Sequence, residues 1–235
     1  MEVLGTIALG LLAGLLTTVA GLGGGLVLTL ILAAFAGPQT ALALAAPALL
    51  LGNIHRITLF RSDLDSRFAM PFVLGAVPGA LVGGFLTLAL PELVLHALIV
   101  LALGLAAAKE FKLIRFTPKA SSVLPISFCV GVLTATSGGG GLLLGPLLLA
   151  AGARGGRFIA SASLIAASVH LARLLAYGAG GLVTSSTLLM SVCIGIAIMV
   201  GNTLGKRVKI SDAKRTRLTY VSLVACGAVT IAGLA

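Results

Sequence analysis

Two glycine clusters are the residues whose type and spacing most clearly suggest chemistry. The first cluster is Gly23, Gly24 and Gly25, and the second is Gly138, Gly139, Gly140 and Gly141. Consecutive glycine N–H groups can line a concavity, and a helix N-terminus beside them adds partial positive charge. Each cluster could therefore bind a small anion without a buried cation. Close packing between helices is the alternative explanation for the same glycines.

A few polar side chains inside apolar stretches could join such a site. His170 and Arg173 are three residues apart and share one face of a helix. A charge at mid-span costs about 2.5–3.5 kcal/mol on insertion scales, so Arg173 is a functional candidate, although its side chain could instead reach the headgroups. His55 is the expected counterpart of His170. Either histidine could carry a proton, since the unperturbed pKa is about 6.5, or could simply fill a buried position. Asn53 could line the same path or bond a neighbouring helix.

The elements that must position these residues are membrane helices. The chain is 59% hydrophobic and 9% charged, and a spanning helix needs about 20 mostly apolar residues. Each glycine cluster interrupts an apolar run, although Gly weakens a helix by about 1 kcal/mol relative to Ala and freed backbone groups find no water in a bilayer. One such break in each half of the chain predicts a duplicated transporter with its site at the breaks.

The predicted segments repeat in the two halves. Short apolar pieces flank the clusters at 6–20, 26–36, 122–137 and 142–152, and spans are predicted at 40–60, 68–90, 92–108, 158–177, 182–204 and 217–234. The predicted domains are a first membrane repeat over 1–108, a basic cytoplasmic connector over 109–121 and a second membrane repeat over 122–235.

The distribution of basic residues predicts the topology. If each broken pair were one kinked crossing, the loop holding Arg61 and Arg67 and the 109–119 connector would lie on opposite sides, against the positive-inside rule. If each pair is a re-entrant hairpin, all 16 basic residues except Arg173 share one face, Arg56 among them. We therefore predict an all-α integral membrane fold of two inverted repeats. Each repeat is a re-entrant Gly-tipped helical hairpin followed by three transmembrane helices, with both termini outside and the basic loops cytoplasmic.

The order of these motifs resembles a known family. A Gly-rich hairpin precedes a Ser-bearing helix, a His-Arg pair, a basic loop and the stretch Pro71-Phe72-Val73-Leu74-Gly75-Ala76-Val77-Pro78-Gly79-Ala80-Leu81-Val82-Gly83-Gly84. The second half is similar, with Gly195, Gly201 and Gly205 before Lys206-Arg207. This pattern resembles the TauE/SafE family of sulfite exporters over essentially the whole chain. The resemblance implies a membrane carrier of small sulfur-containing anions such as sulfite and organosulfonates.

The sequence departs from the family pattern in its first half. The family usually shows a hydroxyl pair after the first hairpin, whereas this chain has Ala45-Ala46-Pro47-Ala48. The second half keeps hydroxyls at Ser161 and Ser163, and Thr136 and Ser137 adjoin the second cluster. We therefore expect an asymmetric site, with backbone N–H donors from the first cluster and hydroxyls from the second half.

The predicted function is a secondary transporter, an exporter of small sulfur-containing anions in the cell inner membrane. An anion channel and a non-transporting scaffold or assembly protein are the alternatives. We expect no enzyme, because the sequence shows no His-rich motif, no Glu near a His in a span and no Ser/His/Asp set. We also expect no cofactor or metal. The expected partners are an inorganic or organic sulfur anion and the lipid bilayer. A homodimer stays open, and nucleic acid is not expected despite the net charge of +10, because no basic stretch is interleaved with aromatics.

Overall fold

The computed structural model describes residues 3–20, 23–110, 113, 119 and 122–208, and this part of the chain contains helices and no strand. The predicted all-α class is confirmed. The helices are α1 (Val3–Ala20), α2 (Gly24–Ala36), α3 (Pro38–Leu59), α4 (Ser66–Ala89), α5 (Glu92–Glu110), α6 (Val123–Ser137), α7 (Gly141–Ala150), α8 (Gly155–Ala179) and α9 (Ser185–Arg207), with a 3-10 turn at Arg61–Asp63. Their ends lie within one helical turn of the predicted bounds. The predicted span at 217–234 lies outside the described residues.

Four of the described helices are long and apolar enough to cross a membrane, namely α3, α4, α8 and α9. Helix α5 holds a shorter apolar stretch, Glu92–Leu105. Large apolar side chains such as Leu74, Leu93, Leu175 and Leu189 are exposed on the helices. In water such surfaces would be unfavourable, so they suit contact with lipid. The membrane character expected from composition is therefore supported by where the apolar side chains point.

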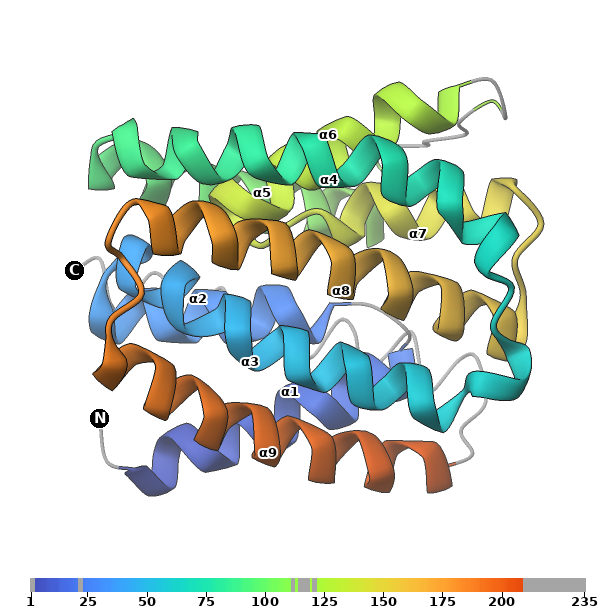
Figure 1. Ribbon diagram of the computed structural model, residues 1–235, viewed down its shortest axis with the longest axis horizontal. Coiled ribbons are helices and arrows are strands. Elements are labelled where there is room, and N and C mark those ends of the chain that lie inside the picture. Colours follow the sequence, from blue (N-terminus) through green and yellow to red (C-terminus); the bar gives the residue numbers. More distant parts are fainter. Residues whose placement is uncertain (1–2, 21–22, 111–112, 114–118, 120–121, 209–235) are drawn as a thin grey trace.

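The long helices lie side by side along the long axis of the molecule (Figure 1). The α3–α4 and α7–α8 connections and the end of α9 lie at one end, and the α4–α5 and α8–α9 connections lie at the other (Figure 1). The first end, which we call the basic end, carries several cations of the described residues, among them Arg61, Arg67, Arg154, Arg157, Lys206 and Arg207. The described α4–α5 and α8–α9 connections at the opposite end hold no Lys or Arg.

Small residues set how closely the helices approach. A Cβ at Gly83 of α4 would lie 2.8 Å from the carbonyl oxygen of Val132 on α6. In the same way, a Cβ at Gly205 of α9 would lie 3.1 Å from the carbonyl oxygen of Leu15 on α1. The contacts between whole helices follow the same scheme, because α4 packs on α6 and α8 while α9 packs on α1 and α3. Helices α3 and α8 also pack on each other and lie at the centre of this arrangement (Figure 1).

Candidate functional site

Two arginines are buried where α3 and α8 pack together. Arg56 of α3 is 2% exposed and Arg173 of α8 is 0% exposed, and each reaches across to the other helix. We call this contact, with the polar groups around both arginines, the α3–α8 seam. Arg56 bonds α8 near its start, whereas Arg173 bonds α3 near its start. The two helices are therefore antiparallel, and the arginines lie toward opposite ends of the seam.

Arg56 is held by neutral groups from both helices. Its Nε donates to Ser163 Oγ at 2.6 Å, and its Nη2 donates to Asn53 Oδ1 at 2.8 Å. Both partners are themselves fixed, because Ser163 Oγ donates to Ile159 O at 2.6 Å and Asn53 Nδ2 donates to Leu49 O at 2.7 Å. No group among the described residues accepts a hydrogen bond from Arg56 Nη1.

Arg173 has three neutral partners. Its Nη1 donates to His170 Nδ1 at 3.0 Å, its Nε donates to Tyr177 Oη at 3.2 Å and its Nη2 donates to Leu42 O at 3.3 Å. Since a guanidinium only donates, His170 accepts with Nδ1 and its ring proton belongs on Nε2. The Arg173 guanidinium carbon also lies 5.4 Å from the centroid of the Tyr177 ring, within the range of a cation–π contact.

The Arg173 group also holds the end of α6. The Tyr177 hydroxyl donates to the carbonyl oxygen of Ala135, which also accepts a hydrogen bond from Thr87 Oγ1 at 3.1 Å. Ala135 lies in the last turn of α6, directly before the second glycine cluster. The position of this cluster is therefore tied to Arg173 through Tyr177.

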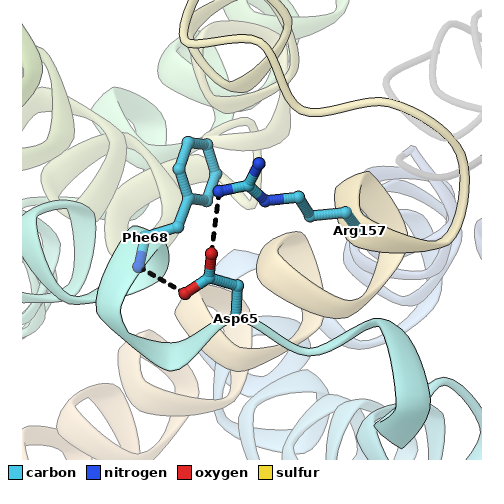
Figure 2. Close-up of polar contacts among 3 residues, drawn as sticks. All are labelled: Asp65, Phe68 and Arg157. Atoms are coloured by element: carbon cyan, nitrogen blue, oxygen red, sulfur yellow. Dashed lines mark hydrogen bonds and ion pairs between the residues drawn. The ribbon is translucent and has the colours of Figure 1, made fainter.

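Neither buried arginine has a carboxylate partner in the described part of the chain. The ion pair found there joins Arg157 Nη2 to Asp65 Oδ2 at 2.8 Å, with side chains that are 44% and 43% exposed. Figure 2 shows this pair at the start of α4, where the Arg157 guanidinium also lies over the ring of Phe68. A buried charge without a partner is unfavourable, so the α3–α8 seam has two positive charges that an anion would stabilise.

The two glycine clusters lie at places where the chain folds back on itself. A Cβ at Gly24 would overlap Thr17 Oγ1 and Ala13 O, one turn or more before the end of α1. A Cβ at Gly140 would overlap Thr134 Oγ1 and Val130 O in the same way. The matching contacts show that close packing requires glycine at these two positions.

The second cluster also contacts the first half of the molecule. Gly138 has a positive φ of 72°, and a Cβ there would lie 2.8 Å from Thr29 Oγ1 of α2. Thr29 is buried and donates to Gly25 O at 2.9 Å. Gly25 in turn faces Leu49 of α3, whose Cδ1 would lie 3.2 Å from a Cβ at Gly25. The tips of both hairpins therefore lie near each other and near the helix that carries Arg56.

Gly23 differs from the other tip glycines because it is exposed. It has a φ of 110°, and no atom lies within 4 Å of a Cβ placed there. In the second cluster Gly139 is buried and Gly141 is half-buried. The first tip is therefore more open than the second.

The predicted hydroxyl groups are mostly engaged within their own helices. Thr136 Oγ1 donates to Val132 O at 3.0 Å, and Ser137 Oγ donates to Leu133 O at 2.8 Å. Ser137 Oγ also accepts from Gly139 N at 3.3 Å, so it supports the second tip. The Ser161 hydroxyl is buried without a partner among the described residues.

The seam brings together only part of the predicted site. Asn53 and Ser163 meet at Arg56, and His170 meets Arg173. The His55 side chain makes no hydrogen bond to either arginine, and its buried Nδ1 has no partner within the described ranges. The role of each of these residues in binding stays a prediction.

Arg56 was expected from the sequence to share a face with the loop cations. In the structure it lies in the last turn of α3, near the basic end, and its side chain is buried. The sequence does contain a signal that Arg56 matches Arg173. Asn53 and Arg56 have the same spacing as His170 and Arg173, and the offset between the two pairs equals the offset from Thr17 to Thr134. Asn53, rather than His55, therefore has the place beside Arg56 that His170 has beside Arg173. The sequence reading also did not single out Tyr177, which contacts Arg173, or Thr87, which shares the Ala135 carbonyl with Tyr177.

The comparison with known families gives one match. The chain matches the sulfite exporter TauE/SafE family over residues 6–231. No match was found among curated proteins or among solved structures. Because the family match covers nearly the whole chain, this protein belongs to the TauE/SafE family of sulfite exporters, and the resemblance identified from the motifs is confirmed.

Proposed function

We propose that this member of the TauE/SafE family is a secondary carrier that exports small sulfur-containing anions, such as sulfite or an organosulfonate, across the cell inner membrane. The observation that carries the proposal is the burial of Arg56 and Arg173 without a carboxylate partner among the described residues. A charge inside a membrane protein is unfavourable unless it is used, and intramembrane ionisable residues mark the pathways of substrates. Two uncompensated cations select for an anionic substrate.

The anion binds where the hairpin tips meet the α3–α8 seam. A guanidinium presents parallel N–H donors that match two oxygens of a sulfite or sulfonate group. The first N–H groups of α2, at Gly24 and Gly25, have no partner within their own helix, and the helix dipole adds positive potential there. The exposed position of Gly23 supports access to this tip. Ser161 supplies a hydroxyl that has no partner among the described residues. Thr136, Ser137 and Ser163 would bind the anion by turning their hydroxyl protons away from the carbonyls of their own helices.

The matched contacts of the two halves support an inverted repeat of re-entrant hairpins. The fold-back at Gly24 against Thr17 has its counterpart at Gly140 against Thr134. Helix α1 packs on α9 as α6 packs on α4, so each hairpin packs on a helix of the other half. The clustering of cations at the basic end supports a cytoplasmic location of that end by the positive-inside rule. Three spans in each half, with α5 and 217–234 as the third ones, complete the proposed topology, which suits alternating access.

The test is counterflow in proteoliposomes loaded with sulfite and challenged in turn with a sulfonate, thiosulfate, sulfate and chloride. We expect saturable exchange that is limited to sulfur oxyanions. Non-saturating flux of chloride and sulfite alike would identify a channel instead. If a thermal melt shows that the protein is folded and no anion is exchanged, the result would contradict a carrier and favour a scaffold role.

A further inference from the structure

We propose that the α3–α8 seam contains two separate anion-binding stations, one around each buried arginine, which hold the substrate in turn. The outer station consists of Arg173, His170 and Tyr177, and the inner station consists of Arg56, Asn53 and Ser163. This inference rests on the proposed carrier function, and it adds a second site and an order of use to it.

The separation of the two groups along the helices is the first argument. On α3 the outer station contacts Leu42, and the inner station begins at Asn53. On α8 the outer station is at Arg173, and the inner station is at Ser163. At a rise of 1.5 Å per residue these levels are roughly 15 Å apart. A sulfite ion that is bound to one guanidinium is too small to contact the other. One shared site is therefore incompatible with the use of both arginines in direct contacts.

The free donors of the two guanidinium groups are the second argument. A guanidinium has five N–H donors. Arg56 gives two of these to described partners and Arg173 gives three, so within the described part of the chain each has at least two N–H groups without an acceptor. The partners already in place hold each guanidinium in a fixed orientation, which is the condition for a preorganised site. Each group is thus complete as a station without the other.

The position of each station relative to the ends of the molecule is the third argument. Arg56 lies in the last turn of α3, near the basic end, whereas Arg173 lies late in α8, toward the opposite end (Figure 1). An opening at either end would therefore expose a different arginine first. On α8, His170 lies between Arg173 and Ser163, so a polar side chain is placed between the two guanidinium groups.

Each station is also linked to a different hairpin tip. Asn53 bonds the carbonyl oxygen of Leu49, and the Leu49 side chain faces Gly25 of the first tip. Tyr177 bonds the carbonyl oxygen of Ala135, directly before the second tip. A movement of one hairpin would therefore act most directly on one of the two stations, which suits alternating access.

The test measures KM for sulfite from each side in membrane vesicles of known orientation. We expect Arg56→Gln to raise KM at the basic end by about tenfold or more, as for one lost charge-assisted hydrogen bond, and to change KM at the opposite end less than about twofold. Arg173→Gln should show the converse. The control is Arg61→Gln, because Arg61 is exposed in the loop after α3. If both variants raise KM equally from both sides, the two-station inference is overturned and the carrier function stands.

A second measurement does not depend on transport. Sulfite that binds the folded protein raises the unfolding temperature in detergent. We expect Arg56→Gln and Arg173→Gln each to keep part of this rise and the double variant to lose it. Loss of the whole rise in either single variant would show one shared site and overturn the inference. Should a Gln variant fail to fold, Arg56→Lys and Arg173→Lys retain the charge and test the same point. If sulfite raises the unfolding temperature of the wild-type protein but the protein does not exchange sulfite, the proposed carrier function is contradicted and the two stations are not.

Discussion

The buried arginines and the surface arginine of this protein use the same side chain in opposite ways. Arg157 is neutralised by Asp65 and stacks on Phe68, and both charged side chains are partly exposed (Figure 2). Arg56 and Arg173 are buried and have only neutral partners in the described structure. A surface ion pair contributes about 0–1 kcal/mol, whereas an uncompensated buried charge is retained at a loss of stability. The surface pair is thus compensated within the protein, whereas the seam arginines have the uncompensated charge on which the proposed binding of an anion rests.

The largest effect is expected from removal of both seam charges. The double variant Arg56→Gln with Arg173→Gln should lower sulfite exchange by about 100-fold or more, because each lost charge-assisted contact is worth about 1.5–3 kcal/mol. Its unfolding temperature in detergent without anion should stay the same or rise, since two unpaired buried charges are removed. The measurement is exchange rate together with a thermal melt. A lower melting temperature with exchange intact would show that these arginines are structural and would remove the contrast with Arg157.

The second-largest effect is expected on stability, when a tip glycine that packs closely is replaced by alanine. Gly24→Ala and Gly140→Ala should each destabilise the protein by about 1–3 kcal/mol, because the new Cβ overlaps backbone that cannot move freely. Gly104→Ala in α5 is the matched control, since no atom lies within 4 Å of its Cβ position. Chemical unfolding in detergent measures the difference. Equal stability of all three variants would mean that the fold-back contacts do not constrain the tips.

A smaller effect is expected from the hydroxyls. Ser163→Ala removes the acceptor of Arg56 Nε and should raise KM for sulfite several-fold, since about 1 kcal/mol of positioning is lost. Ser137→Ala should act in the same direction through the second tip. Thr17→Ala is the control, because Thr17 Oγ1 bonds only the Ala13 carbonyl of its own helix among the described residues. Equal KM values in the three variants would contradict the expected asymmetry between the halves.

The smallest effect should come from the surface pair. Arg157→Gln and Asp65→Asn should each change stability by no more than about 1 kcal/mol and leave sulfite exchange within about twofold of the wild type. The effect should also shrink at high salt, because exposed charges are screened. Exchange assays and thermal melts at two salt concentrations check this. A loss of exchange as large as that of a seam variant would show that charge at the basic end, rather than burial, decides transport.

The amino-acid sequence alone determined the helices and their breaks. Hydropathy and the position of glycine act within a few residues, so the bounds of α1 to α9 and the fold-back at both clusters followed from local pattern. The clustering of cations at one end was also predictable, because the order of the segments determines which loops lie at the same end. The family followed from the same motifs.

Only the tertiary structure decided which charges are buried. Arg56 was grouped with Arg61 and Arg67 on the basic face, but its burial became visible only with α8, which supplies Ser163 from 107 positions away. Arg173 could equally have reached the headgroups, until α3 supplied the Leu42 carbonyl from 131 positions away. Burial of a side chain depends on which distant helix packs over it, and no local pattern contains that information.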